Sequence, residues 1–429
     1  MENKAIIFGL ELPGDHEFEE SLLELENLAT SCGYQTIEVM RQKSDKPTPS
    51  FYIGRGKVDE LKARVDLLNA DLVIFDQELS PVHYRNLEEA LDIKILDRTM
   101  LILEIFESRA HSQVSKLQVS LARDQYMLPR IIGKYRELSR QRGATSTIGG
   151  PGEQKLELER RRLRDNIVRD RRALAKLVTQ RRTQRQKRID AGVFSVAIVG
   201  YTNAGKSTLL NRMVDESKRA LAEEKKVYQE DKLFATLETA SRLIVLPNNR
   251  KFVAIDTVGF VRHMPAHLIA AFRSTLEEIT EADLIVHVLD GSSHEQQTHA
   301  RIVMEAMYDI GVGDTPVIYV RNKMDLIGNP IVKLEMETLD LSAKTGSGVL
   351  RLLAHVSVEM DQYYQTVVLS VPYDEQAIVG ALHEDGYVFH AYNGPETITV
   401  DAELPKRYLT KYAKYIVSSS DIGEMYHPS

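Results

Sequence analysis

Short apolar runs alternate with amphipathic stretches along the first 111 residues of the chain. The runs are rich in Ile, Val, Leu and Phe, which is typical of strands buried in a parallel sheet. The stretches between them repeat apolar residues every three or four positions, as amphipathic helices do. Strands are expected at 5–10, 34–40, 71–76 and 93–97, and helices at 17–31, 56–69 and 81–91. This alternation predicts an N-terminal α/β domain over residues 1–111, with helices covering a parallel sheet.

The pattern changes to long helices between residues 112 and 192. A first helix has an apolar face, and a second, expected over 155–189, carries a heptad-like seam interrupted at Arg160 and Asp170. Two antiparallel helices packed seam to seam are the simplest arrangement, so we expect a helical hairpin here. The seam residues are Val114, Leu117, Leu121 and Leu128 on the first helix, and Leu156, Leu163, Ile167, Leu174 and Leu177 on the second.

Glycines and cations fill the segment between these helices, residues 129–152. The glycines disfavour regular structure, and the segment is longer than a simple connector requires. Residues 109–190 hold 22 Lys and Arg against 8 Asp and Glu, although the whole chain has a net charge of −7. A basic segment in an acidic protein predicts a polyanionic partner, most commonly nucleic acid; a solvated connector is the alternative. The candidate RNA-binding residues are Arg130, Lys134, Arg136, Arg140, Arg142, Gly149 and Gly150.

Strand–helix alternation returns over residues 193–365 and predicts a doubly wound sheet with its ligand at the carboxyl ends of the strands. Strands are expected at 194–199, 241–246, 252–255, 284–289 and 317–320. Residues 366–429 read as a small α+β domain, with a helix near 374–384, strands at 387–392 and 397–400, and a helix over 405–416. The predicted fold class is therefore multidomain α/β, with a long helical hairpin after the first domain.

One strand of this third domain leads into a phosphate-binding motif. The apolar run 194–199 is followed by G-x-x-x-x-G-K-S from Gly200 to Ser207, and helix formers come next. The glycines allow a tight turn that points successive N–H groups at phosphate, and the helix adds its positive N-terminal end. Lys206 can reach the β- and γ-phosphates. The predicted nucleotide contacts here are Gly200, Tyr201, Thr202, Asn203, Ala204, Gly205, Lys206, Ser207 and Thr208.

Two further segments predict the Mg²⁺ and γ-phosphate contacts of a P-loop enzyme. D-x-x-G follows the strand at 252–255 and comprises Asp256, Thr257, Val258 and Gly259. Asp256 can hold Mg²⁺ through water, and the Gly259 N–H can meet the γ-phosphate. Thr236 is the candidate switch threonine, which closes on Mg²⁺ when the γ-phosphate is present. We therefore expect Mg²⁺ at Ser207, Thr236 and Asp256, and catalytic roles for Lys206, Thr236 and Gly259.

The base is predicted from two motifs at later strand ends. N-K-x-D comprises Asn322, Lys323 and Asp325, and a short motif follows at Ser342, Ala343 and Lys344. The Asp325 carboxylate can accept hydrogen bonds from both N1–H and the N2 amino group of guanine, a pair that adenine lacks. The backbone at 342–344 is expected to meet guanine O6. The motifs in this order predict a GTP-binding domain.

Catalysis departs from the Ras-like template, in which a glutamine after the D-x-x-G glycine orients the attacking water. Phe260 occupies that position and cannot form such a hydrogen bond. We therefore expect slow hydrolysis by the isolated chain, with the missing group supplied by a partner, another residue or a monovalent cation. Asn203 resembles the asparagine of potassium-activated GTPases, which suggests a K⁺ site; a loop-stabilising hydrogen bond is the alternative.

The chain resembles the HflX GTPases, a ribosome-associated family of the translation-factor class. The resemblance rests on YIGRGKVDEL (52–61), ELSPVHYRNLE (78–88), LDRTMLILEIFESRA (96–110), KLQVSLARDQYMLPR (116–130), GGPGEQKLELERRRLR (149–164), GYTNAGKS (200–207) and DTVGF (256–260). It implies binding of the large (50S) ribosomal subunit and its rRNA through the hairpin loop, splitting of stalled ribosomes, and GTPase activity stimulated by the ribosome. Two departures from the family pattern are Gln154, where threonine is common, and the segment 143–148.

The remaining expectations concern location and rival functions. With one cysteine, no secretory leader and no long apolar run, the chain is expected to be cytoplasmic, without a membrane span, and monomeric off the ribosome. The first rival is a GTP-dependent RNA-remodelling or ribosome-maturation factor whose basic hairpin opens RNA. The second is a signalling switch with a protein effector, for which the basic loop would be dispensable.

Overall fold

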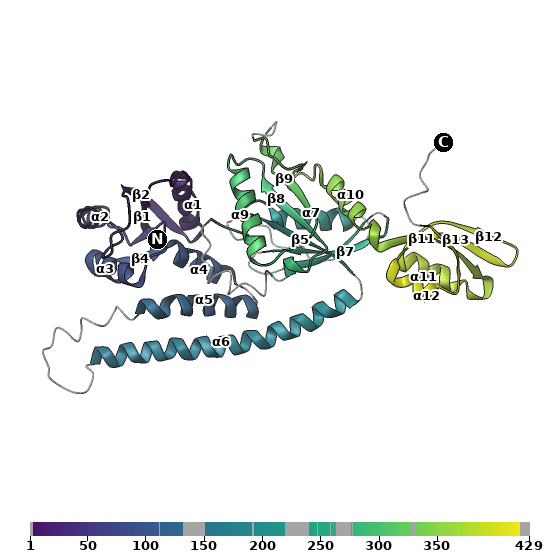
Figure 1. The fold of residues 1–429 in the computed structure, drawn as a ribbon, viewed down its shortest axis with the longest axis horizontal. Coiled ribbons are helices and arrows are strands. Elements are labelled where there is room, and N and C mark those ends of the chain that lie inside the picture. Colours follow the sequence, from purple (N-terminus) through teal and green to yellow (C-terminus); the bar gives the residue numbers. More distant parts are fainter. Residues whose placement is uncertain are drawn as a thin grey trace. The chain divides into compact units, whose positions relative to one another are not determined.

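A computed structural model describes residues 3–110, 112–131, 151–190, 193–218, 240–246, 248–257, 259–262, 276, 278–327 and 332–420. The described residues group into two compact units. The first contains those up to 181 together with 260–262, and the second contains 182–218, 240–259 and 276–420. Figure 1 shows the mixture of helices and parallel and antiparallel sheets that makes up the chain, which confirms the predicted multidomain α/β class.

The first unit contains a four-stranded parallel sheet with strand order β2-β1-β3-β4. Its central strands are buried on both faces, as their continuous apolar runs predicted. Pro81 begins α3 behind the Ser80 cap, and Asp97 caps α4 by accepting from the Met100 N–H. The elements are β1 Asn3–Glu11, α1 Phe18–Ser31, β2 Tyr34–Lys43, α2 Arg55–Leu68, β3 Leu72–Phe75, α3 Pro81–Leu91, β4 Lys94–Asp97 and α4 Arg98–Arg109. Helix α4 was not expected as a separate element.

The long helices are α5, Gln113–Ile131, and α6, Pro151–Asp190. The buried face of α5 packs against α3 and α4 of the N-terminal domain. Within α6, Asp170 is 2% exposed and accepts a hydrogen bond from Ser120 Oγ at 2.8 Å. The residue expected to interrupt the seam is thus a buried polar link between the helices. The apolar face of α5 belongs to the N-terminal domain, so this helix is anchored to that domain.

The second unit contains a six-stranded sheet with order β10-β9-β8-β5-β7-β6, parallel except for the edge strand β6. Aliphatic side chains of the sheet and of two flanking helices, α7 and α10, form its core. The elements are β5 Phe194–Gly200, α7 Lys206–Lys218, β6 Ala240–Val245, β7 Lys251–Asp256, β8 Leu284–Asp290, α9 Gln296–Asp309, β9 Val317–Asn322, β10 Leu339–Asp340 and α10 Val349–Glu359. The sheet thus places the carboxyl ends of β5, β7, β8 and β9 along one edge.

The last part of the second unit is an antiparallel sheet with order β12-β13-β11-β14. The helix expected over 405–416 was wrong: α12 is only Leu409–Tyr412, and the β-branched pair Ile416 and Val417 begins a further strand that pairs with β11. The elements are β11 Tyr364–Pro372, α11 Ala377–Asp385, β12 Tyr387–Asn393, β13 Thr397–Pro405, α12 and β14 Ile416–Ser420. In the ranges that the structure describes, no helix has the length and apolar character needed to cross a membrane.

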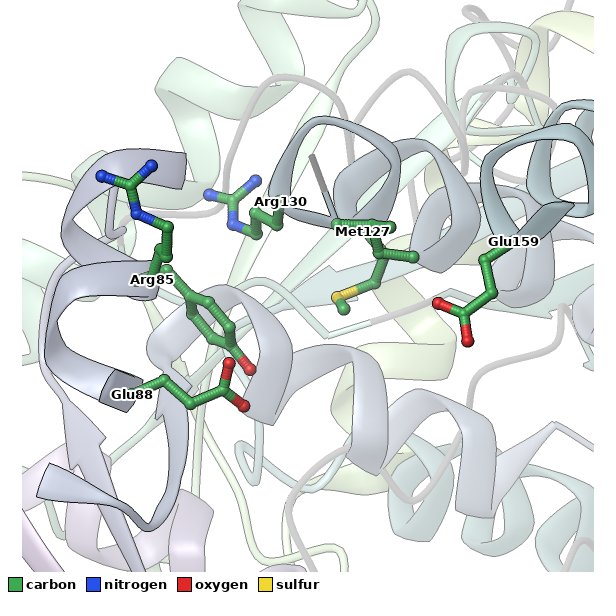
Figure 2. A pocket seen from close by; sticks show the side chains of 7 residues that line it. Arg85, Glu88, Met127, Arg130 and Glu159 are labelled. Carbon is green, nitrogen blue, oxygen red and sulfur yellow. The ribbon is translucent and has the colours of Figure 1, made fainter. Parts of the chain in front are cut away.

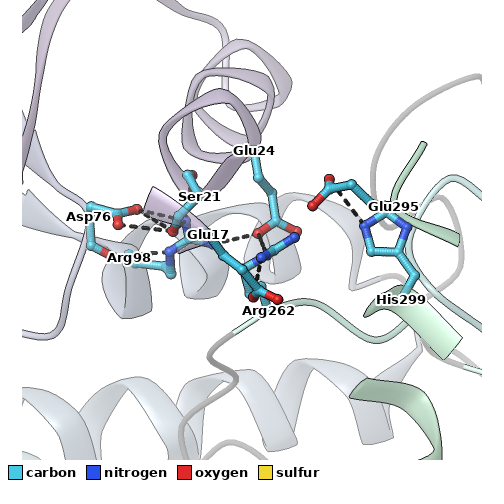
Figure 3. Close-up of polar contacts among 8 residues, drawn as sticks. All are labelled: Glu17, Ser21, Glu24, Asp76, Arg98, Arg262, Glu295 and His299. Carbon is cyan, nitrogen blue, oxygen red and sulfur yellow. Dashed lines mark hydrogen bonds and ion pairs between the residues drawn. The ribbon is translucent and has the colours of Figure 1, made fainter. Parts of the chain in front are cut away.

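A buried ionic network holds α1, β3 and α4 of the first unit together. Arg98 is 2% exposed, and its guanidinium contacts Asp76 at 2.6 Å and Glu24 at 2.7 Å. The same group donates to the Ser21 carbonyl, and Ser21 Oγ donates to Asp76 (Figure 3). Because Asp76 is also buried, its charge depends on Arg98 for compensation.

We expect Arg98→Met to lower the free energy of opening of the first sheet by about 3–5 kcal/mol, since the variant leaves a buried carboxylate without its cation. Native-state amide hydrogen exchange of β1 and β3 measures this quantity in a chain with several domains. Arg123→Met is the matched control, because Arg123 is exposed and pairs with Glu107 at the surface; its effect should stay below about 1 kcal/mol. Equal effects of the two substitutions would contradict the network's role.

Candidate nucleotide-binding site

The phosphate-binding motif forms a tight loop between β5 and α7. Gly200 has φ +152°, and a Cβ at this position would lie 2.3 Å from the Val288 carbonyl oxygen. Gly205 has φ +91°, and a Cβ there would lie 2.2 Å from the Asn322 side-chain amide. Neither position can accept a side chain without displacing backbone or a buried amide. The two glycines are therefore required by the close approach of β8 and β9, in addition to any approach of phosphate.

Lys206 lies inside this loop with its ammonium group directed to backbone carbonyls. Its Nζ donates to the carbonyls of Gly200 at 3.0 Å and Tyr201 at 2.8 Å. Desolvation by burial lowers the pKa of Lys206 to about 8, although the charge of Asp256 opposes that change. A phosphate group beside this buried ammonium group would favour its charged form. The lysine is thus poised to bind an anion.

Two further groups of the loop fit an anionic ligand. Thr202 is 7% exposed, and its Oγ1 has no hydrogen-bond partner among the described residues. A Cβ at Gly259 would lie 3.0 Å from Lys206 Nζ and 2.8 Å from the Thr202 side chain. The D-x-x-G glycine therefore lies beside the phosphate loop, as expected for a backbone N–H that meets the γ-phosphate.

Ser207 and Asp256 lie together, as a Mg²⁺ site of this class requires. Ser207 Oγ donates to Asp256 Oδ2 at 2.7 Å, and the Asp256 side chain is fully buried. No cluster of three or more His, Cys, Asp or Glu side chains suited to a metal occurs in the described part of the chain. Since Mg²⁺ is usually held by one or two protein oxygens, substrate phosphates and water, this pair fits the ion without such a cluster.

The base-recognition motifs are joined to the phosphate loop by one side chain. Asn322 Nδ2 donates to the Ala204 carbonyl at 2.9 Å, and its Oδ1 accepts from the Ala343 N–H at 2.8 Å. Asp325, which is exposed, accepts from Ser342 Oγ at 2.6 Å. The structure thus brings N-K-x-D, residues 342–344 and the phosphate loop into one site.

Several contacts of this site were not predicted. Asp290, at the carboxyl end of β8, pairs with Lys323 Nζ at 2.9 Å, and Arg212 of α7 donates to the Ala343 carbonyl at 3.1 Å. The Tyr201 ring stacks on His299 of α9 with centroids 3.9 Å apart. Asp290 follows a buried strand in the same way as Asp256 and Asn322, so the strand-end argument could have identified it. Nothing in the local sequence indicates the partners of Arg212 or Tyr201.

Some predicted site residues lie outside the described residues. These are Thr236, Val258 and the loop cations Lys134, Arg136, Arg140 and Arg142, with Gly149 and Gly150. Phe260 is described and is 3% exposed, so its ring is buried away from solvent. The roles proposed for the undescribed residues stay predictions, as do the bounds of the four domains drawn from the sequence.

Arg130 differs from its predicted role as a loop cation for RNA. It lies in the last turn of α5, is 6% exposed, and donates to the carbonyls of Tyr126 at 2.9 Å and Leu79 at 2.6 Å. Its guanidinium also lies 3.3 Å from the centroid of the Tyr126 ring. Figure 2 shows it beside a cavity of about 160 Å³ between α3, α5 and α6. Because these contacts occupy the guanidinium inside the protein, we correct the assignment: Arg130 anchors the last turn of α5 and is not a free cation for RNA.

Asp325→Asn tests the base-recognition assignment. An amide replaces one acceptor oxygen with a donor, which opposes the guanine N–H groups but suits the carbonyl at position 2 of xanthine. We expect GDP affinity to fall on the order of 10²-fold and xanthosine diphosphate affinity to rise, both measured by isothermal titration calorimetry. The control is Asp309→Asn, at the exposed end of α9. An unchanged preference for GDP would remove Asp325 from the base site.

Comparison with known proteins shows which families and structures the chain resembles. Family profiles described as GTP-binding GTPase N-terminal, GTP-binding GTPase Middle Region and 50S ribosome-binding GTPase match residues 19–107, 109–188 and 195–323. A crystal structure of a GTP-binding protein from Sulfolobus solfataricus with GDP covers 84% of this chain and 99% of its own, at 24% identity and a TM-score of 0.43.

Curated relatives carry the assignment. The GTPase HflX of Caldanaerobacter subterraneus is 40% identical over 94% of this chain and 91% of its own length. The GTPase HflX of Escherichia coli K12 is 36% identical over 87% of this chain and 86% of its own. With a guanine-type base motif, a phosphate loop and a serine–aspartate pair for Mg²⁺ assembled at one sheet edge, and with this similarity along nearly its whole length, the chain belongs to the HflX family of GTPases.

Proposed function

We propose that this GTPase binds the large ribosomal subunit and splits stalled ribosomes when GTP is bound. The match of residues 195–323 to a domain described as a 50S ribosome-binding GTPase supports the partner. The excess of cations over residues 109–190 supports contact with rRNA, since phosphate neutralisation dominates such affinity. The observation that carries the proposal is the ionic contact of Arg262, which follows the D-x-x-G motif by three residues.

Arg262 joins the switch segment to the N-terminal domain. The chain passes from Asp256–Gly259, which cluster with the second unit, to residues 260–262, which cluster with the first. Arg262 is 2% exposed, and its guanidinium lies 2.5 Å from Glu17, the N-cap of α1, and 3.9 Å from Glu24 in the middle of that helix (Figure 3). A backbone shift at Gly259 on γ-phosphate binding would therefore displace Arg262, which is paired with the carboxylates of Glu17 and Glu24.

The contact continues toward the helical arm. Glu24 also pairs with Arg98 at 2.7 Å, Arg98 begins α4, and α4 packs against α5. Helix α5 leads into the cationic loop, and Arg130 fixes its last turn to the N-terminal domain. We infer that GTP favours one position of this assembly over another, with the strength set by its different affinity for the two states.

The residues of the phosphate loop and of the D-x-x-G motif support GTP hydrolysis that depends on a partner. Ser207 and Asp256 would hold Mg²⁺, which neutralises charge on the β- and γ-phosphates when it is bound. Lys206 would bind and orient the phosphates, the Gly259 N–H would meet the γ-phosphate, and Thr236 is expected to close on Mg²⁺. Phe260 offers no hydrogen bond to a water molecule, so the group that orients the attacking water comes from outside these residues. We place it on the ribosome, which makes GTP turnover faster with 50S subunits than without.

Sedimentation of purified 70S ribosomes tests the proposal. With the protein and a non-hydrolysable GTP analogue, we expect 70S particles to separate into 30S and 50S, whereas GDP leaves the profile unchanged. An RNA-remodelling or maturation factor predicts no change with either nucleotide. GTP turnover should also rise on addition of 50S subunits, by an amount in the range of about 10³–10⁵-fold that an external activating group can supply.

Glu17→Gln tests the coupling through Arg262. The amide keeps the size of the side chain but removes its charge, so the preference for 50S subunits with the GTP analogue over GDP should shrink by about threefold to tenfold. Nucleotide affinity should not change. Glu19→Gln is the matched control on the same helix, since Glu19 is exposed and pairs with Arg41. If the two variants behave alike, Arg262 does not transmit the nucleotide state.

A comparison of K⁺ and Na⁺ buffers tests the proposed cation at Asn203. Asn203 is exposed and adopts φ +60°, so its side chain is accessible beside the phosphate loop. A K⁺ ion held there would supply positive charge to the phosphates, and GTP turnover should be faster in K⁺ than in Na⁺ at equal ionic strength. Asn203→Ala should abolish the difference. Equal rates in the two salts for the parent chain would reject the site.

A further inference from the structure

The edge strand β12 of the C-terminal sheet exposes an aromatic surface. Tyr387 is 38% exposed, Phe389 is 45% and Tyr392 is 57%. Tyr387 and Tyr392 lie opposite Glu403 and Thr399 of β13, whereas Val388 lies opposite Ala402 and packs into the core. A bulge between Val388 and His390 leaves Phe389 without a partner residue in β13. The Phe389 ring meets the Tyr387 ring edge to face, with the two ring centroids 5.2 Å apart. Because side chains alternate along a strand, Tyr387 and Tyr392 lie on the face of the sheet opposite to the one that carries Val388.

Acidic residues outnumber basic ones in the sequence that contains these rings. Residues 384–403 contain five acidic residues and no Lys or Arg. Asp385 is already bonded to Lys411, and Glu403 to Arg250. Glu384, Glu396 and Asp401 add negative charge in the helix before the strand, the turn after it and the neighbouring strand β13. A negative potential over exposed aromatic faces favours cations, because an ammonium or guanidinium group gains from both.

The backbone of β12 is also open on one side. Among the described strands, β13 alone pairs with β12, which forms the edge of the sheet (Figure 1). Edge strands are usually protected by lysine, by proline or by a covering element. The sequence of β12, YVFHAYN, has no lysine or proline, and six of its seven residues are exposed. Its unpaired N–H and C=O groups can therefore accept an extended chain as a further strand.

We propose that β12 binds an extended, Lys- and Arg-rich protein segment by strand addition, with the cationic side chains stacked on Tyr387, Phe389 and Tyr392. Backbone hydrogen bonds to the open edge hold the segment, and alternate side chains meet the aromatic rings. Single-stranded RNA can also stack on aromatic rings, but it requires a positive groove for its phosphates. The acidic residues of this surface oppose RNA, so a basic peptide is the occupant that the charge favours.

The experiment measures peptide binding to the full-length chain by fluorescence anisotropy. The probe is labelled acetyl-Arg-Val-Lys-Val-Arg-Val-Lys-amide. One control, acetyl-Glu-Val-Glu-Val-Glu-Val-Glu-amide, reverses the charge. The other, acetyl-Arg-Pro-Lys-Pro-Arg-Pro-Lys-amide, keeps the charge but removes N–H donors. We expect the first peptide to bind at least about tenfold more tightly than either control. Amide hydrogen exchange over 387–393 should slow when it binds.

Tyr387→Ser with Tyr392→Ser should weaken the probe on the order of tenfold, because two cation–π contacts are lost. Tyr308→Ser, which removes an exposed aromatic ring 81% accessible on α9, should have no effect. Unchanged GDP affinity and circular dichroism will show that the double variant folds. The proposal is overturned if the three peptides bind equally or if the double variant has no effect. It is also overturned if exchange over 387–393 does not change or if dodecauridylate competes for this strand. None of these outcomes depends on ribosome binding.

Discussion

The nucleotide site depends on one geometric constraint, the common edge at which the parallel strands β5, β7, β8 and β9 end. Each strand delivers a different polar group there: the phosphate loop, Asp256, Asp290 and Asn322. Parallel pairing fixes the register of these strands, so groups that lie more than a hundred residues apart in sequence meet within hydrogen-bond distance. The site is assembled by the sheet, and the loops supply its chemistry.

A chain of buried charges lies within the first unit, and the proposed coupling depends on it. Arg262 and Arg98 are buried, and both contact the carboxylate of Glu24, which is itself largely buried. Buried ionic groups contribute little net stability compared with apolar packing, but losing one partner is costly. Such a network therefore tolerates few arrangements, which suits a contact that must differ between two states.

Sequence patterns located the strands and motifs because buried parallel strands and phosphate loops impose strong local signals. The family assignment and the α/β class are confirmed, and the pairing of Ser207 with Asp256 agrees with the expected geometry. The errors arose where tertiary packing decides. Arg130 was predicted to be a loop cation, but it contacts the Leu79 carbonyl and the Tyr126 ring. The local sequence does not indicate either contact. The end of the C-terminal domain was wrong because strand β11, distant in sequence, provides the partner for β14.

Asn322 has a consequence for how this enzyme can evolve. Its amide bridges the loop that faces phosphate and the loop that faces the base, and its side chain fills the space beside Gly205. One side chain thus joins the segment predicted to bind the phosphates to the segment predicted to bind the base. A lineage could change its nucleobase at Asp325 and keep this bridge, whereas a change at Asn322 would loosen both loops at once. Selection for another base would therefore act on Asp325 and leave Asn322 in place.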